Sequence, residues 1–118
     1  KICFLGVTFK ANTDDMRDSS SLSMIPYLIK KGALVNYFDP TGEKADFVKL
    51  KNVKFSDNIN SAIKDSDLII IHTEWNDFKS INFKKEVQNK KFMIFDMRNI
   101  YSAVKMRELK IKYFGVGL

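Results

Sequence analysis

A polar loop near the start of the chain holds the residue types that bind anions. Residues 8–18 follow an apolar run and include Lys10 and Arg17, three carboxylates and an amide. An arginine offers a planar fork of donors, and a lysine offers a point charge. Both cations precede a serine cluster, residues 19–21, which is typical of a helix N-terminus. Anions are favoured at such a terminus and cations are not. We therefore interpret Lys10 and Arg17 as contacts for a bound phosphate or carboxylate rather than as solvated surface charges.

A second segment, residues 96–99, repeats this arrangement. Asp96 ends an apolar run, and Arg98 follows at what we expect to be the start of a helix. A second arginine at the same edge of a sheet would strengthen the anion-site hypothesis, because two separate loops would then supply positive charge to one place.

The loop carboxylates and the single cysteine have simpler explanations than catalysis. The spacing of Asp14, Asp15 and Asp18 does not match a calcium-binding loop. We expect helix capping and an ion pair with Arg17 instead, and we predict no metal site. Cys3 lies in an apolar run without a neighbouring histidine to lower its pKa, so we interpret it as a buried apolar side chain.

Two further side chains follow the apolar run 68–71. His72 is either a ligand contact or a hydrogen-bonded imidazole of the core or the sheet edge. Trp75 either covers the edge of the sheet or packs against a ligand or a neighbouring domain.

Short apolar runs alternating with helical patterns must position these side chains. Most of the runs are continuous, as in strands that are covered on both faces. Strand–helix alternation of this kind predicts an α/β fold, a Rossmann-like three-layer sandwich with a mostly parallel sheet of five to six strands in the order 3-2-1-4-5-6. The expected strands are residues 2–7, 34–38, 53–55, 68–71, 92–95 and 111–116.

Three helices are expected between the strands. Leu22, Ile25 and Ile29 share one helical face, and Gly32 can end that helix. Pro26 should kink the helix or mark its true first turn. Shorter helical patterns occupy residues 58–63 and 100–107.

This topology brings three polar segments to the carboxyl ends of the central strands. They are residues 8–17, 73–75 and 96–99, and ligands of doubly wound sheets bind at that edge. The first strand is not followed by the G-x-G-x-x-G pattern of dinucleotide-binding folds. We therefore expect no conventional dinucleotide site in this domain alone.

Composition narrows the class of protein. The chain has 118 residues, 45% apolar and 29% charged, which suits one globular domain spanning 1–118. No apolar run reaches about 18 residues, so no membrane span is expected. One cysteine suits a reducing, cytoplasmic location. The net charge of +6 fits either simple solubility or an anionic partner, and there is no basic run of the nucleic-acid type. Because the chain begins with Lys1 rather than Met and opens directly on an expected strand, we expect it to be a fragment of a longer protein.

Five segments in order resemble the C-terminal domain of the UDP-glucose/GDP-mannose dehydrogenase family. They are residues 6–19, 37–40, 73–78, 96–99 and 113–117. The Thr73-Glu74-Trp75 sequence is more similar to the UDP-glucose branch than to the other branches. Met97 stands where many relatives have glycine, a departure from the pattern beside Arg98.

The resemblance implies a UDP-binding domain of an NAD-dependent UDP-glucose 6-dehydrogenase, which oxidises the sugar C6 alcohol to a carboxylate in two hydride-transfer steps. Phe9, Lys10 and Arg98 would contact UDP-glucose, and Arg17 would approach NAD held by the N-terminal domain of the same chain. The catalytic cysteine would lie in the connecting region, so this fragment alone would be inactive. The whole enzyme would form a homo-oligomer.

Two other hypotheses stay open at this point. One is a sister enzyme that acts on GDP-mannose or UDP-N-acetylmannosamine. The other is a basic α/β module that binds nucleic acid and has no enzymatic activity.

Overall fold

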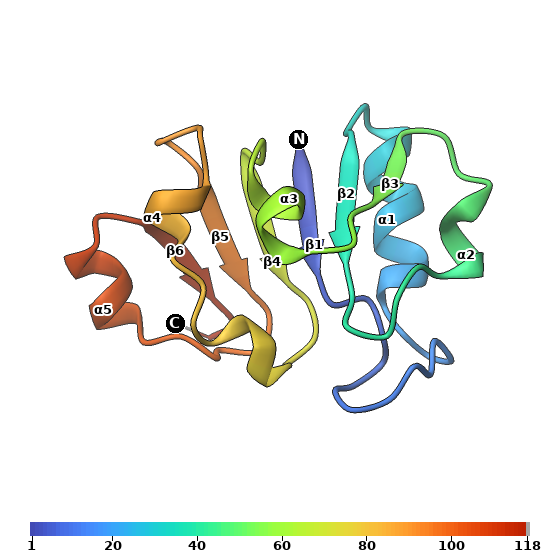
Figure 1. The fold of residues 1–118 in the computed structure, drawn as a ribbon, viewed down its shortest axis with the longest axis horizontal. Helices are drawn as coiled ribbons and strands as arrows, with labels where there is room; N and C mark the ends of the chain where they lie inside the picture. Colours follow the sequence, from blue (N-terminus) through green and yellow to red (C-terminus); the bar gives the residue numbers. More distant parts are fainter. Residues whose placement is uncertain (118) are drawn as a thin grey trace.

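Six parallel strands form one sheet in the order β3-β2-β1-β4-β5-β6, which confirms the predicted topology. The computed structural model describes residues 1–117, and Leu118, the end of the predicted 1–118 domain, lies outside them. Figure 1 shows β1 and β4 side by side at the centre of the sheet. The elements in chain order are β1 Ile2–Leu5, α1 Ser21–Lys30, β2 Val35–Phe38, α2 Ala45–Val48, β3 Val53–Phe55, α3 Ile59–Ile63, β4 Leu68–Ile71, the 3₁₀ helix η1 Asn76–Phe78, α4 Phe83–Glu86, β5 Met93–Asp96, α5 Ala103–Glu108 and β6 Lys112–Gly115.

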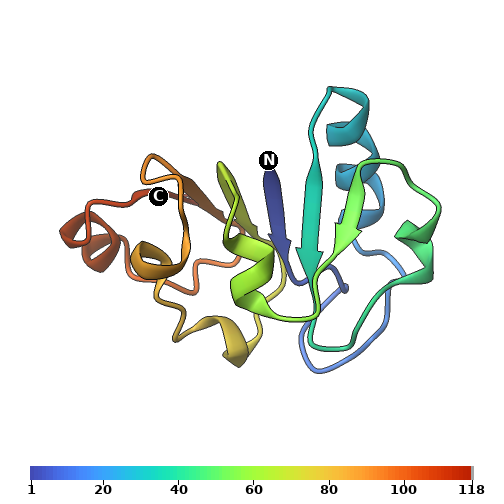
Figure 2. The same cartoon turned by 45° about the horizontal axis from the view of Figure 1, so that its top comes forward.

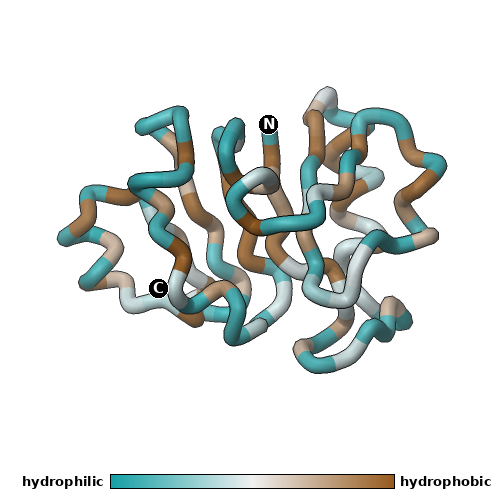
Figure 3. The backbone as a smooth tube through the Cα atoms, in the orientation of Figure 1, coloured by the Kyte–Doolittle hydropathy of each residue, from teal (hydrophilic) through white to brown (hydrophobic). Residues whose placement is uncertain are grey.

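Helices cover both faces of the sheet, so the fold has the three layers that the sequence predicts. Ile25 of α1 and Phe47 of α2 belong to the core cluster on one face. Residues of α3, α4 and α5 belong to the cluster on the opposite face, and Figure 2 shows this division from a second angle. Apolar residues run along the strands in Figure 3, whereas the turns between elements are largely hydrophilic. Burial on both faces explains why the central strands read as continuous apolar runs.

Helix α1 ends as the sequence predicts, but Pro26 does not mark its beginning. The helix starts five residues earlier, at Ser21, and Pro26 lies inside it, so only the alternative in which Pro26 marks the first turn is wrong. At the other end Gly32 adopts a left-handed φ of 97°, and the Ala33 N–H bonds the carbonyl of Leu28 at 3.0 Å. This is the Schellman arrangement, in which a glycine just past the helix satisfies its last carbonyls.

The expectation that Arg98 begins a helix is also wrong. Helix α5 starts at Ala103, and the residues between β5 and α5 form a loop in which Asn99 has a φ of 55°. The Asp96 carboxylate accepts hydrogen bonds from the backbone N–H groups of Arg98, Ile100 and Tyr101. These bonds compete with helix formation in this segment, and the left-handed φ of Asn99 interrupts any helix before Ala103.

Candidate functional site

Lys10 and Arg98 line the same pocket at the carboxyl ends of the central strands. The pocket has a volume of about 330 Å³ and lies where the loops after β1, β4 and β5 meet. The sequence predicted this meeting of the three loops, but it did not indicate that the amide side chains of Asn12 and Asn76 would line the pocket. The lining residues are Lys10, Ala11, Asn12, Glu74, Asn76 and Arg98.

The guanidinium of Arg98 joins two of these loops. Its Nε donates to the His72 carbonyl at 3.2 Å, and its Nη2 donates to the Phe9 carbonyl at 3.1 Å. Arginine has five N–H donors, so three remain for a ligand. Arg98 is thus held in place by its own chain and can still form a two-pronged contact with a phosphate.

Lys10 and Glu74 bring unpaired charges to the pocket. Within residues 1–117 no ion pair involves either side chain. The Thr8 hydroxyl donates to the Lys10 carbonyl at 2.9 Å, which fixes the backbone that carries the ammonium group. The lysine suits an anion, whereas Glu74 can accept hydrogen bonds from hydroxyl groups.

Phe9 and Arg17 lie in the same loop but do not line this pocket. The side chain of Phe9 is 46% exposed, and its backbone carbonyl receives Arg98. Arg17 is 88% exposed and pairs with Asp15, with 3.0 Å from Nη2 to Oδ2. The hydrogen bond from Arg17 lowers the pKa of Asp15, and the same bond raises the pKa of Arg17. The predicted ion pair is confirmed, and Arg17 is not among the residues that line the pocket of Lys10 and Arg98.

The predicted capping of α1 by an aspartate is wrong. Ser20 occupies the N-cap position and makes no side-chain capping bond. Its neighbours Ser19 and Ser21 both donate to the Val7 carbonyl at 2.6 Å. The serine cluster therefore fastens the start of α1 to the end of the first strand.

Two buried aspartates organise the rim. Asp96 receives the loop N–H groups described above and also the Tyr113 hydroxyl at 2.8 Å. Asp39, which follows β2, accepts the Val7 N–H at 2.9 Å and both the N–H and the hydroxyl of Thr41. Sequence reasoning gave Asp39 no role of its own, although a carboxylate directly after a buried strand is a usable signal.

Cys3 and His72 are both buried. Burial raises the pKa of the Cys3 thiol, so the interpretation as an inert apolar side chain is confirmed. Burial, together with a smaller effect of the nearby charge of Arg98, lowers the pKa of His72 to about 4. His72 is therefore neutral near pH 7, and its ring bonds Ser20 and Thr73. This agrees with the hydrogen-bonded imidazole rather than the ligand contact.

Trp75 is 7% exposed and belongs to the core cluster on the face covered by α3, α4 and α5. Its Nε1 has no hydrogen-bond partner within residues 1–117, and nothing in the structure explains why. The side chain is therefore buried against the core just beyond the end of β4.

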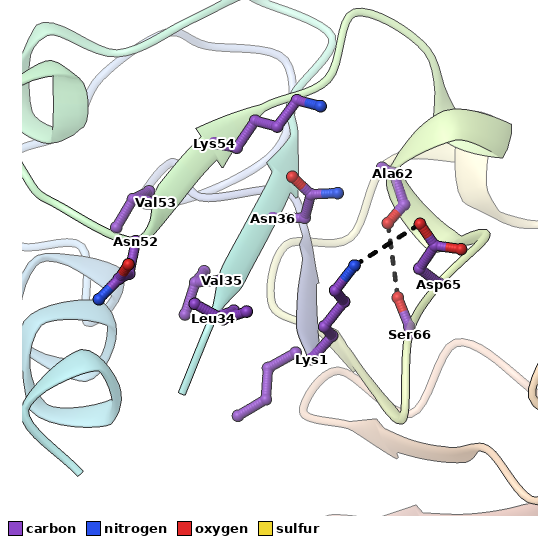
Figure 4. Close-up of a pocket in the computed structure, with 11 residues that line it drawn as sticks. Lys1, Leu34, Val35, Asn36, Asn52, Val53, Lys54, Ala62, Asp65 and Ser66 are labelled. Atoms are coloured by element: carbon purple, nitrogen blue, oxygen red, sulfur yellow. Dashed lines mark hydrogen bonds and ion pairs between the residues drawn. The ribbon is translucent and has the colours of Figure 1, made fainter. Parts of the chain in front are cut away.

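A second pocket lies at the opposite, amino-terminal end of β1, β2 and β3. It measures about 270 Å³, and Figure 4 shows Lys1 and Asp65 pointing toward each other across it. Their atoms are 3.7 Å apart. Lys54 also lines this pocket, but the predicted polar loops lie at the other end of the sheet, so this pocket is the weaker candidate for an anion site.

Residues 1–117 contain no group of three or more His, Cys, Asp or Glu side chains placed to hold a metal ion. None of the helices described is both long enough and apolar enough to cross a membrane.

A doubly wound parallel sheet with two cations at a pocket on its carboxyl edge places the chain among the Rossmann-like α/β domains. The comparisons with known proteins identify it further. The model of the UDP binding domain of the UDP-glucose/GDP-mannose dehydrogenase family matches residues 3–103, and the chain belongs to this family.

Known members resemble the chain over nearly its whole length. The UDP-glucose 6-dehydrogenase of Rickettsia felis is 36% identical over 98% of this chain and 27% of its own. The solved UDP-glucose dehydrogenase of Pyrobaculum islandicum matches with a TM-score of 0.72 and 27% identity, over 98% of this chain and 24% of that one. The solved UDP-D-ManNAc dehydrogenase of Pyrococcus horikoshii matches with a TM-score of 0.74 and 26% identity, over 98% of this chain and 25% of that one. The chain thus spans about a quarter of the length of the relatives it matches.

Proposed function

We propose that the chain is the UDP-sugar-binding domain of an NAD-dependent UDP-glucose 6-dehydrogenase. The observation that carries this proposal is the shared pocket of Lys10 and Arg98, in which the lysine is unpaired and the arginine keeps free donors. Two cations from different loops suit a diphosphate, whose charge is spread over two groups. The names of the Rickettsia and Pyrobaculum relatives support UDP-glucose as the sugar nucleotide.

In this proposal the chain binds and orients the substrate, and the oxidation takes place elsewhere. Lys10 and Arg98 would hold the diphosphate, and the exposed ring of Phe9 would pack against the nucleotide. Fixing the diphosphate places the sugar C6 at a defined distance from the catalytic cysteine, which would belong to another part of the enzyme. Within this chain, burial makes Cys3 unsuitable for that role.

NAD would be held mainly by another domain and would accept the hydride in each step. Arg17 fits a contact with it, because its guanidinium is 88% exposed and points away from the core. A cation displayed on a loop can reach the phosphates of a cofactor bound by a neighbouring domain.

Titration of the chain with UDP tests this function. Trp75 is the only tryptophan and stands between two residues that line the pocket, Glu74 and Asn76. Its fluorescence should change as UDP binds, and amide NMR shifts should concentrate in residues 9–17 and 96–99. Uridine, which lacks the diphosphate, should bind much more weakly. Shifts confined to the amino-terminal pocket, or salt-dependent binding of RNA or DNA without a response to UDP, would contradict the proposal.

A sister nucleotide-sugar dehydrogenase is the second candidate. The structural match to the Pyrococcus UDP-D-ManNAc dehydrogenase, at 26% identity, supports this second candidate, because that relative is named for a different sugar nucleotide. Comparing UDP-glucose, UDP-N-acetylmannosamine and GDP-mannose as substrates of the full-length enzyme separates these possibilities through their kcat/KM values.

A further inference from the structure

A chain of side-chain hydrogen bonds links the start of α1 to the loop after β1. The Ser20 hydroxyl lies 2.9 Å from His72 Nε2, and His72 Nδ1 lies 3.0 Å from Thr73 Oγ1. The Thr73 hydroxyl is 2.9 Å from the carbonyl of Thr8, and the Thr8 hydroxyl donates in turn to the Lys10 carbonyl. The chain therefore ends at the backbone of the pocket lysine.

The direction of the bonds around His72 follows from the Thr8 carbonyl, which cannot donate. The Thr8 carbonyl can only accept, so the single proton of the Thr73 hydroxyl must point to it. Thr73 Oγ1 must then accept from His72 Nδ1–H. Because the ring is neutral near pH 7, its Nε2 carries no proton and accepts from Ser20. One tautomer of His72 satisfies every member of the chain.

The Ser20 hydroxyl is available for this bond. Ser20 precedes α1 with helical backbone angles, φ −64° and ψ −19°, and its side chain caps no N–H group of the first turn. The hydroxyl instead contacts His72, which connects the start of α1 to the end of β4.

We propose that Ser20, His72 and Thr73, the rim clamp, hold both ends of the 8–20 loop against the end of β4 and thereby position Lys10 and Arg98 for the nucleotide. The clamp reaches Arg98 through the His72 carbonyl, which accepts from Arg98 Nε. These are positioning residues, since they act through Lys10 and Arg98. Their role in affinity rests on the proposed function, whereas their role in ordering the loop does not.

The first test is a measurement on the unmodified chain. His72 is the only histidine, so ¹⁵N NMR of the ring reports it without overlap. The expected result is the tautomer with a proton on Nδ1 and none on Nε2. The opposite tautomer at pH 7 would overturn the proposal. Nδ1 would then carry no proton, and the single Thr73 hydroxyl proton could not be donated both to Nδ1 and to the Thr8 carbonyl.

The second test uses variants matched in shape. Thr73→Val removes the hydroxyl with little change in volume, and Thr73→Ser keeps it. We expect Thr73→Val to weaken UDP binding about tenfold, the usual effect of one lost internal hydrogen bond that orders a site, and Thr73→Ser to restore most of the affinity. Ser20→Ala should give a smaller loss in the same direction. Ser61→Ala, an exposed hydroxyl on α3, should leave binding unchanged.

Amide hydrogen exchange keeps the inference testable whatever happens with UDP. In Thr73→Val and Ser20→Ala, exchange should accelerate in residues 9–17, while the strands stay protected. If Thr73→Val does not fold, the exchange rates of Ser20→Ala alone test the clamp. Ser20 is exposed, so its replacement should leave the fold intact. Unchanged exchange in the loop would overturn the clamp. If the unmodified chain fails to bind UDP but exchange in the loop of the variants accelerates as expected, the proposed function is contradicted and the rim clamp is still supported.

Discussion

Gly6 lies so close to Thr73 that a Cβ atom on Gly6 would be 2.6 Å from the Cβ of Thr73. Its φ of 78° is also one that side chains with a Cβ rarely adopt. The missing side chain lets the Thr73 hydroxyl reach the loop after β1, where it bonds the Thr8 carbonyl. The glycine thus serves close packing between β1 and β4, a different use from the glycine turns of dinucleotide-binding folds.

Gly6→Ala should therefore destabilise the fold by about 3 kcal/mol, the sum of left-handed backbone strain and overpacking. Gly32→Ala is the matched control, because its φ is 97° but a Cβ there would meet no atom within 4 Å. It should lose only about 1–2 kcal/mol. Urea unfolding measures both values, and equal losses would show that the contact with Thr73 does not matter.

Arg98→Lys should weaken UDP binding although the charge is kept. The arginine reaches two carbonyls and keeps donors for the ligand, whereas a lysine ammonium is a single point charge. We expect a loss of about tenfold in affinity and of about 1 kcal/mol in stability. Calorimetric titration measures the affinity for UDP, and thermal unfolding measures the stability. Arg107→Lys on α5 serves as the control. Full retention of affinity would mean that charge alone suffices at this position.

Lys10→Ala in the full-length enzyme should lower kcat/KM for UDP-glucose strongly, by about 10- to 100-fold, because a charge-assisted contact to phosphate is lost. Stability should change little, since the ammonium has no ion pair within residues 1–117. Lys30→Ala, an exposed lysine at the far end of α1, should behave as the unmodified enzyme. An unchanged kcat/KM for Lys10→Ala would refute its assigned role.

Stability should fall as the pH drops from about 6.5 to 4 because of His72. Its pKa in the fold is about 4 against an ordinary value of 6.5, so the unfolded chain takes up a proton first. The stabilisation is fully present above pH 6.5 and is lost as the pH falls through 4. Each pKa unit corresponds to about 1.4 kcal/mol, so lowering the pKa from 6.5 to about 4 gives a total loss of about 3.5 kcal/mol.

His72→Gln should flatten this dependence, which denaturant unfolding at a series of pH values can measure. The difference between the two proteins isolates His72 from the carboxylates, which titrate lower. A parallel pH dependence in both proteins would show that the imidazole is not the responsible group.

Asp96→Asn should cost about 2–4 kcal/mol, because one acceptor oxygen becomes a donor facing N–H groups of the loop after β5. The exposed Asp46→Asn is the control. The loop carrying Arg98 should lose order, so UDP affinity should fall together with stability. Loss of stability without loss of affinity would show that Asp96 does not position Arg98.

The strand order could be predicted because it depends on patterns that repeat along the chain. Apolar runs separated by helical spacing leave few right-handed parallel arrangements. The boundary of α5 could not be predicted in the same way. Ile100 fits the helical spacing, but its N–H bonds the Asp96 carboxylate, and a local side-chain-to-backbone bond of that kind competes with the helix.

The sequence allowed us to predict which loops meet at the site. It did not allow us to predict which atoms in those loops form hydrogen bonds. Lys10 and Arg98 were candidates from residue type and position, and the structure places both at one pocket. Nothing in the sequence indicated that Arg98 would bond two carbonyls or that Ser20 would turn away from its helix to His72. Such pairings join residues far apart in the chain, where spacing carries no information.

The buried position of Asp39 limits how this domain could be redesigned. In dinucleotide-binding sheets an acidic side chain downstream of the glycine turn receives the ribose hydroxyls, but here the carboxylate is already occupied by Val7 and Thr41. Grafting a glycine-rich turn after β1 would therefore leave the adenosine ribose without its usual acceptor. A change of cofactor preference would have to begin by freeing that carboxylate.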